Sequence, residues 1–192
     1  LIFARYPVSG RTKTRLIPAL GADGAARLHR RMTEHVVAVA RETRRHPVST
    51  GPPRITVCYT GASRRDFTAW LGTDLHYQAQ SKGDLGARMG AAFKQAFEDG
   101  ATLTLLVGSD LPDLTPGILL EAFEKLRDHD VILGPAHDGG YYLIGMKRLH
   151  AGLFAERDWG TGHVYERTSD QIHHLGLRFA DLPALRDMDR QI

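Results

Sequence analysis

The sequence predicts an α/β domain with a mixed, mostly parallel central sheet and helices on both faces. Short apolar runs alternate along the chain with segments of helical period, which is typical of this class. The run at residues 103–107 (Leu-Thr-Leu-Leu-Val) is apolar throughout, as in a strand buried on both faces. The run at residues 141–146 begins only about seven residues after the previous one, too few for a crossover helix, so we expect one antiparallel strand.

The predicted strands are short runs of apolar character. We expect them at residues 1–4, 55–59, 76–80, 103–107, 131–133, 141–146 and 177–182. Helical segments separate most of them, which predicts parallel pairing for all but the run at 141–146.

The predicted helices carry apolar residues at helical spacing. Between Leu28 and Val39 these residues recur at steps of four, four and three. Thr115 supplies an N-cap and Pro116 a first helical residue. Residues 44–53, which are rich in Pro, Ser, Thr and Gly, predict a loop. We expect helices at residues 23–40, 64–71, 85–97, 116–126 and 163–175.

Length and charge narrow the class of protein. A chain of 192 residues fits one domain spanning residues 1–192. The 25 Lys and Arg exceed the 22 Asp and Glu only slightly, and the excess is local to residues 5–15 and 41–45, which favours a phosphate-bearing small molecule over a nucleic acid. No apolar run approaches the ~20 residues that span a bilayer. Cys58 is the single cysteine, and we expect it in the core. From these features we expect a cytoplasmic protein. The sequence leaves the oligomeric state open.

Asp110 follows the expected central strand directly. Gly108 and Ser109 end the apolar run, and Pro112 breaks the chain after it. In open α/β sheets, ligands bind in the crevice beyond the carboxyl ends of the strands. Asp110 is therefore placed where a metal ligand for a phosphorylated substrate would lie. The alternative is an Asp that caps a turn.

A basic loop follows the first expected strand. Ser9, Gly10, Arg11, Lys13 and Arg15 combine exposed amides, a hydroxyl and three cations, which suits a diphosphate. The spacing is not that of a Walker A loop. The alternative is a solvated basic loop. We expect Lys13 to lie at the surface and to contribute little to folding.

Paired glycines follow the strand expected at residues 131–133. Asp138, Gly139 and Gly140 allow close approach of the backbone to a ligand, and the Asp offers an acceptor, a metal ligand or a base. The alternative is a tight turn between antiparallel strands, for which Asp-Gly is a strong signal. Both hypotheses can hold together at one edge of the sheet.

The segment from Gln80 to Gly86 precedes the helix expected at residues 85–97. Gln80 and the amides around Gly83, Asp84 and Gly86 could read the edge of a nucleobase. Gly-Asp before an apolar helix is equally typical of an ordinary N-terminal cap.

Four segments, taken in order, resemble a known family. They are residues 3–16, 83–89 (Gly-Asp-Leu-Gly-Ala-Arg-Met), 108–114 (Gly-Ser-Asp-Leu-Pro-Asp-Leu) and 134–145 (Gly-Pro-Ala-His-Asp-Gly-Gly-Tyr-Tyr-Leu-Ile-Gly). The chain is similar to the bacterial family named domain of unknown function 2064, which is grouped with glycosyltransferases of the nucleotide-diphospho-sugar transferase superfamily. The resemblance implies a GT-A-like, Rossmann-type α/β/α sandwich. Guanylyltransferases acting on 2-phospholactate, sugar-1-phosphate uridylyltransferases and molybdopterin-cofactor enzymes are more distantly similar.

The resemblance assigns roles by position. Asp110 matches the metal-binding carboxylate, Lys13 and Arg15 match phosphate-contacting cations, and Gln80 resembles the base-reading Gln. Asp189 falls in a segment that resembles a second metal-ligand segment. Two patterns are absent: no Asp-x-Asp of the glycosyltransferase type is present, and the Gly-x-Gly-x-Arg loop of nucleotidyltransferases is missing.

These features predict a metal-dependent glycosyltransferase that uses a nucleotide-diphosphate sugar. Mg²⁺ or Mn²⁺ held by Asp110 and Asp189 would neutralise the leaving group, and Asp110 and Asp138 would be the catalytic carboxylates. The partner is a nucleotide or nucleotide sugar, with no membrane involved. A nucleotidyltransferase releasing pyrophosphate and a non-catalytic nucleotide-binding module stay as alternatives. The acceptor or sugar would contact Gly139, Gly140, Tyr141, Trp159 and Thr161.

Overall fold

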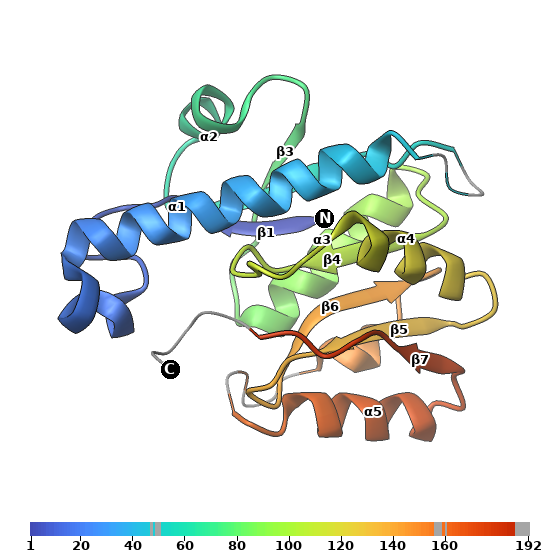
Figure 1. Ribbon diagram of the computed structural model, residues 1–192. Coiled ribbons are helices and arrows are strands. Elements are labelled where there is room, and N and C mark those ends of the chain that lie inside the picture. The colour runs from blue at the N-terminus through green and yellow to red at the C-terminus, as the bar shows by residue number, and fades with distance from the viewer. Residues whose placement is uncertain (47, 49–50, 156–158, 160, 187–192) are drawn as a thin grey trace.

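The sheet places its most apolar strand at its centre. The computed structural model describes residues 1–46, 48, 51–155, 159 and 161–186. In this part of the chain a seven-stranded sheet has the order β3-β2-β1-β4-β6-β5-β7 (Figure 1). The strands are β1 (Ile2–Arg5), β2 (Thr56–Thr60), β3 (His76–Ala79), β4 (Thr104–Val107), β5 (Val131–Pro135), β6 (Tyr141–Met146) and β7 (Phe179–Asp181).

The pairing confirms the predicted mixed sheet. β6 runs antiparallel to both of its neighbours, β4 and β5. The other pairings between named strands are parallel. The turn from β5 to β6 is short, and Gly139 adopts a φ of 86° within it, a conformation that glycine reaches without steric strain.

Helices cover both faces of this sheet. They are α1 (Ile17–Arg44), α2 (Arg64–Leu71), α3 (Leu85–Glu98), α4 (Pro116–Lys125) and α5 (Val164–His174), with 3₁₀ turns η1 (Thr14–Leu16) and η2 (Ala151–Phe154). α1 begins at Ile17 rather than at residue 23, because a first turn that contains Pro18 joins the main helix across a kink at Gly21. The loop expected at 44–53 begins one residue later, since Arg44 ends α1, and residues 47, 49 and 50 lie outside the described residues.

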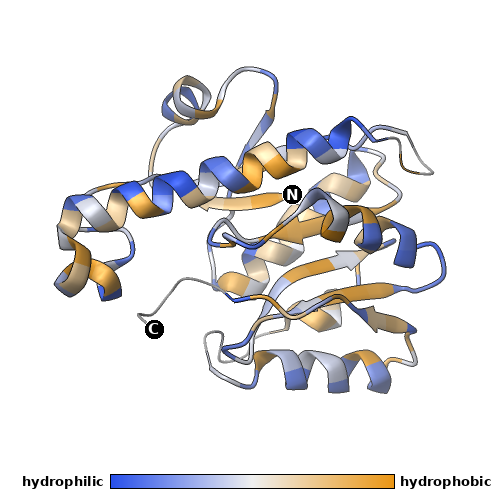
Figure 2. Ribbon diagram, viewed as in Figure 1, coloured by the Kyte–Doolittle hydropathy of each residue, from blue (hydrophilic) through white to orange (hydrophobic). Residues whose placement is uncertain are grey.

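Alternation along the central strand divides the core into two layers. Leu105 and Val107 pack on the face covered by α1, α2 and α4, whereas Leu106 packs on the face covered by α3 and α5. Leu105 is 6% exposed and Val107 is 3% exposed. In Figure 2 the strands are coloured mostly as hydrophobic, whereas the helices carry both hydrophobic and hydrophilic residues. The prediction of a doubly covered central strand is confirmed.

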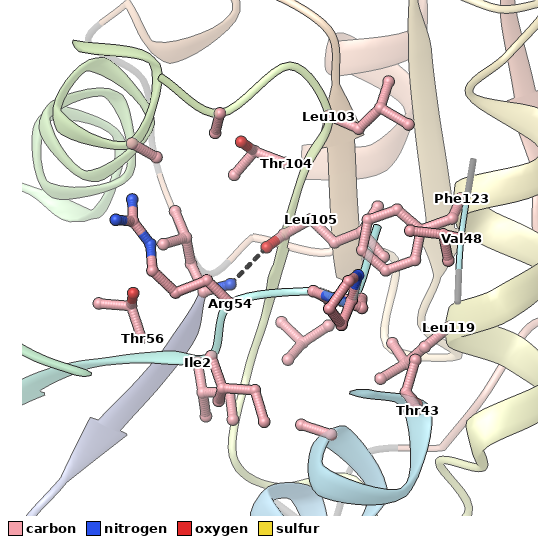
Figure 3. A pocket seen from close by; sticks show the side chains of 18 of the residues that line it. Ile2, Thr43, Val48, Arg54, Thr56, Leu103, Thr104, Leu105, Leu119 and Phe123 are labelled. Carbon is pink, nitrogen blue, oxygen red and sulfur yellow. Dashed lines mark hydrogen bonds between the residues drawn. The ribbon is translucent and has the colours of Figure 1, made fainter. Parts of the chain in front are cut away.

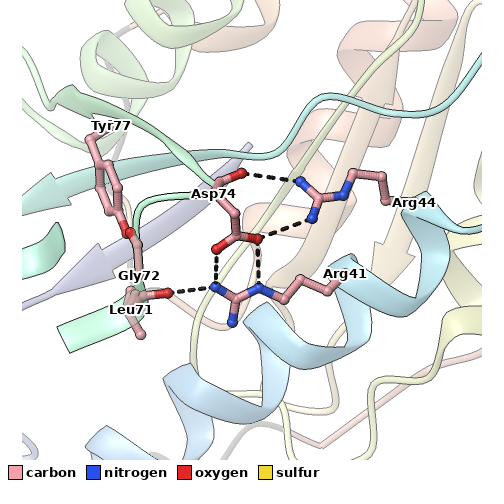
Figure 4. Close-up of polar contacts among 6 residues, drawn as sticks. All are labelled: Arg41, Arg44, Leu71, Gly72, Asp74 and Tyr77. Carbon is pink, nitrogen blue, oxygen red and sulfur yellow. Dashed lines mark hydrogen bonds and ion pairs between the residues drawn. The ribbon is translucent and has the colours of Figure 1, made fainter. Parts of the chain in front are cut away.

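A polar clamp fixes the end of α1 to the loop before β3 (Figure 4). The Arg41 guanidinium donates from Nε to Asp74 Oδ2 at 3.0 Å and from Nη2 to the other carboxylate oxygen and to the Leu71 carbonyl. Arg44 donates to Asp74 Oδ2 and to its carbonyl oxygen, at 3.0 and 3.1 Å. The hydrogen bonds from Arg41, helped by those from Arg44, hold the pKa of Asp74 well below its usual range.

The amino edge of the sheet carries a cavity of about 360 Å³ (Figure 3). Its lining includes Leu1, Arg54, Leu105 and Phe123. This cavity lies opposite the edge at which open α/β sheets bind their ligands.

Within the described residues, no helix is long and apolar enough to span a membrane.

Candidate functional site at the carboxyl edge

Asp110 lies three residues beyond the carboxyl end of β4, at the edge where loops from several strands meet. The loop after β1 brings Lys13 to it, and the turn after β5 brings Asp138 to the same region. Because β1, β4 and β5 run parallel, their carboxyl ends share one edge. The fold thus gathers residues that are up to 125 positions apart in the sequence.

The carboxylate of Asp110 is bonded at both oxygens. Lys13 Nζ lies 3.0 Å from Oδ2, and His29 Nδ1 lies 2.8 Å from Oδ1. The side chains of Lys13 and His29 are 4% and 5% exposed, against 31% for Asp110. Burial opposes ionisation of Asp110, but the hydrogen bond from His29 and the charge of Lys13 outweigh it, so the pKa of Asp110 lies below its usual value.

His29 joins this carboxylate to the end of β1. Its Nε2 lies 2.9 Å from the carbonyl oxygen of Arg5, which can only accept. Its Nδ1 lies 2.8 Å from Asp110 Oδ1. His29 therefore orients Asp110 relative to the backbone of β1, while Lys13 supplies a positive charge that balances the carboxylate.

The loop before Lys13 is shaped by Thr12. The Val8 N–H donates to Thr12 Oγ1 at 3.0 Å, and this hydroxyl donates to the Tyr6 carbonyl at 3.4 Å. Thr12 is 4% exposed. Lys13 follows with a φ of 51° and a ψ of 45°, the left-handed conformation that L-residues rarely adopt. The loop thereby turns the Lys13 ammonium inward to Asp110.

This arrangement corrects the expectation that Lys13 lies at the surface. Its side chain is buried and ion-paired with Asp110. Lys13 reaches this position because its backbone is left-handed and its loop lies close to the end of β4. Neither feature can be seen in the local sequence.

A cationic cavity of about 470 Å³ opens beside this cluster. Asp110 is the carboxylate among its described lining residues, and the positive side chains outnumber it. These are Arg5, Arg11, Lys13, Arg15 and Arg88. His29 lines the same cavity. Such a field favours a polyanion.

An aromatic cavity of about 250 Å³ lies on the other side of Asp110. Tyr141, Tyr142 and Trp159 line it together with Asp138, Thr161 and several aliphatic side chains. The two cavities share Phe3, Leu85, Gly108, Ser109 and Asp110. Asp110 therefore stands at the junction between a cationic space and an aromatic one.

The turn that carries Asp138 is fixed by its own contacts. Asp138 Oδ1 accepts from the Gly140 N–H at 2.9 Å, and the Tyr165 N–H donates to the Gly139 carbonyl at 2.9 Å. A Cβ on Gly139 would collide with the carbonyl of Gly162, so this position requires glycine. The turn hypothesis for this segment is confirmed, and its role as a wall of a ligand site stays a prediction.

Gln80 lines the cationic cavity with both ends of its amide engaged. Its Nε2 donates to the Cys58 carbonyl at 2.8 Å, and Arg88 donates to its Oε1 at 3.2 Å. Gln80 thus holds Arg88 in place. Base recognition by Gln80 stays a prediction.

Several predicted residues line neither cavity. They are Ser9, Gly10, Gly83, Asp84, Gly86 and Gly139. Asp84 caps α3 by accepting from the Ala87 N–H at 2.7 Å. Gly86 lies beneath Trp159, because a Cβ there would come within 2.8 Å of the indole Cε2. Roles for these residues in ligand binding stay predictions, and Asp189 lies outside the described residues.

Asp110 offers one carboxylate to a divalent cation, so such a cation would take its other ligands from a substrate and from water. Among the described residues, no group of three His, Cys, Asp or Glu side chains is placed to hold a metal. Mg²⁺ in nucleotide enzymes takes one or two carboxylates, and substrate phosphates and water complete its shell. Asp110 supplies one such carboxylate beside a cavity suited to phosphates.

His29 and Arg88 were not predicted from the sequence. His29 lies on the buried face of α1, where Ala25, Ala26, Met32 and Val36 are also buried. The sequence signal that could have identified His29 is its place within an apolar stripe of a helix. A His that is buried there needs hydrogen-bond partners.

Comparison with known proteins agrees with this geometry. The profile of a bacterial family described as uncharacterized, DUF2064, matches residues 43–161. A provisionally assigned nucleotide-diphospho-sugar transferase from Desulfovibrio desulfuricans G20 is 33% identical, with a TM-score of 0.84 over 98% of this chain and 80% of that one. None of the curated proteins matches the chain.

More distant structures share the fold. A CMP:2-keto-3-deoxy-manno-octonic acid synthetase complexed with CTP is 13% identical, with a TM-score of 0.57 over 98% of this chain and 91% of the other. The 4-diphosphocytidyl-2C-methyl-D-erythritol synthase of Anaerococcus prevotii is 11% identical, with a TM-score of 0.57 over 95% and 85%. The chain belongs to the DUF2064 family, within the nucleotide-diphospho-sugar transferase superfamily.

Proposed function

We propose that this protein is a transferase that moves a glycosyl group from a nucleotide-diphosphate sugar to an acceptor hydroxyl. The observation that carries the proposal is the position of Asp110 between a cationic cavity and an aromatic one. The first suits the diphosphate of a donor, and the second suits a less polar molecule. A site of group transfer must hold the donor on one side of the reacting atoms and the acceptor on the other.

In this proposal the cationic cavity binds the diphosphate. Breaking the bond between the anomeric carbon and the β-phosphate oxygen leaves the electron pair on the nucleoside diphosphate. Fixed cations next to the developing charge stabilise the transition state more than the ground state. Lys13 and Arg15 line the cavity and are proposed for this role.

A divalent cation, Mg²⁺ or Mn²⁺, would supply further neutralisation of the leaving diphosphate when it is bound. Asp110 is proposed as its ligand from the protein. Binding of a metal requires Asp110 to exchange the contact with Lys13 for one with the cation, while the donor's phosphates attract Lys13. His29 would keep the carboxylate oriented throughout, because it bonds the other oxygen.

The acceptor hydroxyl would attack the anomeric carbon from the aromatic cavity. As its oxygen forms the new bond, its proton must leave. Asp138 lines this cavity, and one of its oxygens is engaged by the Gly140 N–H. The other oxygen is proposed as the acceptor of that proton.

The test is a ligand screen followed by product analysis. Nucleotides and nucleotide sugars are added in thermal-shift assays with and without Mn²⁺, since a ligand at ~100 times its Kd adds roughly 2.7 kcal/mol of stability. The best donor is then incubated with a panel of alcohols. Release of nucleoside diphosphate supports glycosyl transfer. Release of pyrophosphate from a nucleoside triphosphate would contradict glycosyl transfer and support nucleotidyl transfer. Binding without turnover would show that the protein is a nucleotide-binding module.

A further inference from the structure

The aromatic cavity differs from the cationic cavity in charge as well as in shape. Its described lining holds no cationic side chain: the charged residues are Asp138 and Asp110, and the charge of Asp110 is balanced by Lys13 at 3.0 Å. The negative charge of Asp138, with no cation beside it in this lining, disfavours a phosphate or a carboxylate there. A phosphorylated partner therefore fits the cationic cavity and is disfavoured in the aromatic one.

The size of the cavity limits what it can hold. Its volume is about 250 Å³, whereas an apolar cavity of about 150 Å³ is known to hold one benzene molecule. The space accommodates a single ring with substituents and is too small for a second nucleotide. The donor and its partner are thus distinguished by volume as well as by charge.

The walls favour a ring with an apolar face. Tyr141, Tyr142 and Trp159 contribute aromatic surface, and Leu106 and Val164 contribute aliphatic surface. Gly86 lies beneath Trp159, and because it has no Cβ the indole can pack there at the cavity wall. Pockets of this kind bind by apolar contact and use a few polar groups to fix orientation.

We infer that the second substrate is an uncharged alcohol of one-ring size, such as a monosaccharide ring or an aromatic alcohol, and not a phosphorylated or carboxylated metabolite. This inference rests on the proposed function, because it identifies the class of acceptor for the same transfer. Its ring lies against the aromatic walls, and its hydroxyl lies between Asp110 and Asp138. Discrimination against anions comes from Asp138 and from the lack of a cationic side chain in the described lining of this cavity.

The experiment compares two probes that share a phenyl ring and have similar size: benzyl alcohol, which is neutral, and phenyl phosphate, which is anionic. Excess inorganic pyrophosphate first occupies the cationic cavity, and calorimetry verifies that it binds. Ligand-observed NMR titration of the whole chain then gives a Kd for each probe. We expect benzyl alcohol to bind at least about tenfold more tightly, equivalent to about 1.4 kcal/mol.

A matched pair of variants tests the origin of this preference. Asp138→Asn removes the charge and keeps a side-chain oxygen that can accept from the Gly140 N–H, so the preference for benzyl alcohol should fall about three- to tenfold. Asp170→Asn makes the same change on the exposed surface of α5 and should leave it unchanged.

The outcomes separate this inference from the proposed function. Binding of phenyl phosphate as tight as that of benzyl alcohol, or binding of neither probe, overturns the inference, whereas binding of pyrophosphate still supports the donor site. An unchanged preference in Asp138→Asn also overturns the assigned cause. Failure of pyrophosphate to bind contradicts the proposed function itself.

Discussion

The imidazole of His29 and the carboxylate of Asp110 lie 2.8 Å apart, although 81 positions separate them in the sequence. The contact joins the buried face of α1 to the carboxyl end of β4. His29 also bonds the Arg5 carbonyl at the end of β1. One side chain thereby fixes the relative positions of a helix, two strand ends and the central carboxylate of the site.

His29→Phe should lower the free energy of unfolding by about 1–3 kcal/mol, because it leaves the Arg5 carbonyl and one Asp110 oxygen without their partner. Urea denaturation measures this change. His163→Phe is the control, since His163 is 68% exposed and pairs only with an exposed Glu166; we expect a change within about 0.5 kcal/mol there. Equal effects in the two variants would show that the His29 contacts are unimportant for stability.

Two substitutions at Lys13 separate its charge from its backbone conformation. Lys13→Ala and Lys13→Gly both remove the cation, so both should weaken nucleotide binding by about one to two decades. Glycine adopts the left-handed conformation without strain, so the Gly variant should be about 1 kcal/mol more stable than the Ala variant. Calorimetry and thermal melts provide the two measurements. Unchanged affinity in both variants would contradict a phosphate role for Lys13.

The position of Asp110 just beyond the central strand could be predicted because the sequence signals for it are local. An apolar run, a Gly-Ser break and a proline mark the end of a buried strand, and the position beyond such an end follows from the general behaviour of α/β sheets. The antiparallel β6 was predicted for a similar reason, since the chain between β5 and β6 is too short to cross the sheet.

His29 and the burial of Lys13 could not be predicted in the same way. His29 pairs with Asp110 through the packing of α1 on β4, and no local pattern encodes that register. Lys13 is buried because Thr12 and a left-handed turn redirect the loop. The early start of α1 was missed because the kink at Gly21 interrupts the helical pattern.

The clamp at Asp74 should make stability depend on pH. A carboxylate whose pKa is lowered in the folded state stabilises it above the unfolded pKa, about 3.9, and the effect disappears as the pH falls through the folded pKa. Asp74→Asn should therefore destabilise the protein at pH 7, by at most about 1 kcal/mol because the Asp74 side chain is 43% exposed. The difference from the parent should shrink below pH ~4. A difference that is constant down to strong acid would contradict the ion-pair account.

Gly86→Ala should disturb the wall of the aromatic cavity. The added Cβ would come within 2.7 Å of the Phe154 carbonyl and 2.8 Å of the Trp159 ring. We expect a loss of about 1–3 kcal/mol and a changed Trp159 fluorescence spectrum. Gly117→Ala in α4 is the control, because its Cβ would meet nothing closer than Thr115 Oγ1 at 3.7 Å. Native stability and an unaltered spectrum in Gly86→Ala would show that Trp159 does not rest on Gly86.

The central claim is that the cationic cavity binds the diphosphate of a nucleotide, and Arg15 tests it most directly. Arg15 lines that cavity and is exposed, so Arg15→Ala should leave the fold intact. The measurement is a calorimetric titration of nucleoside diphosphates into the parent, Arg15→Ala and Arg127→Ala, in which Arg127 pairs with Glu124 at the far end of α4. The account predicts at least about tenfold weaker binding in Arg15→Ala alone. Equal affinity in all three proteins would contradict it.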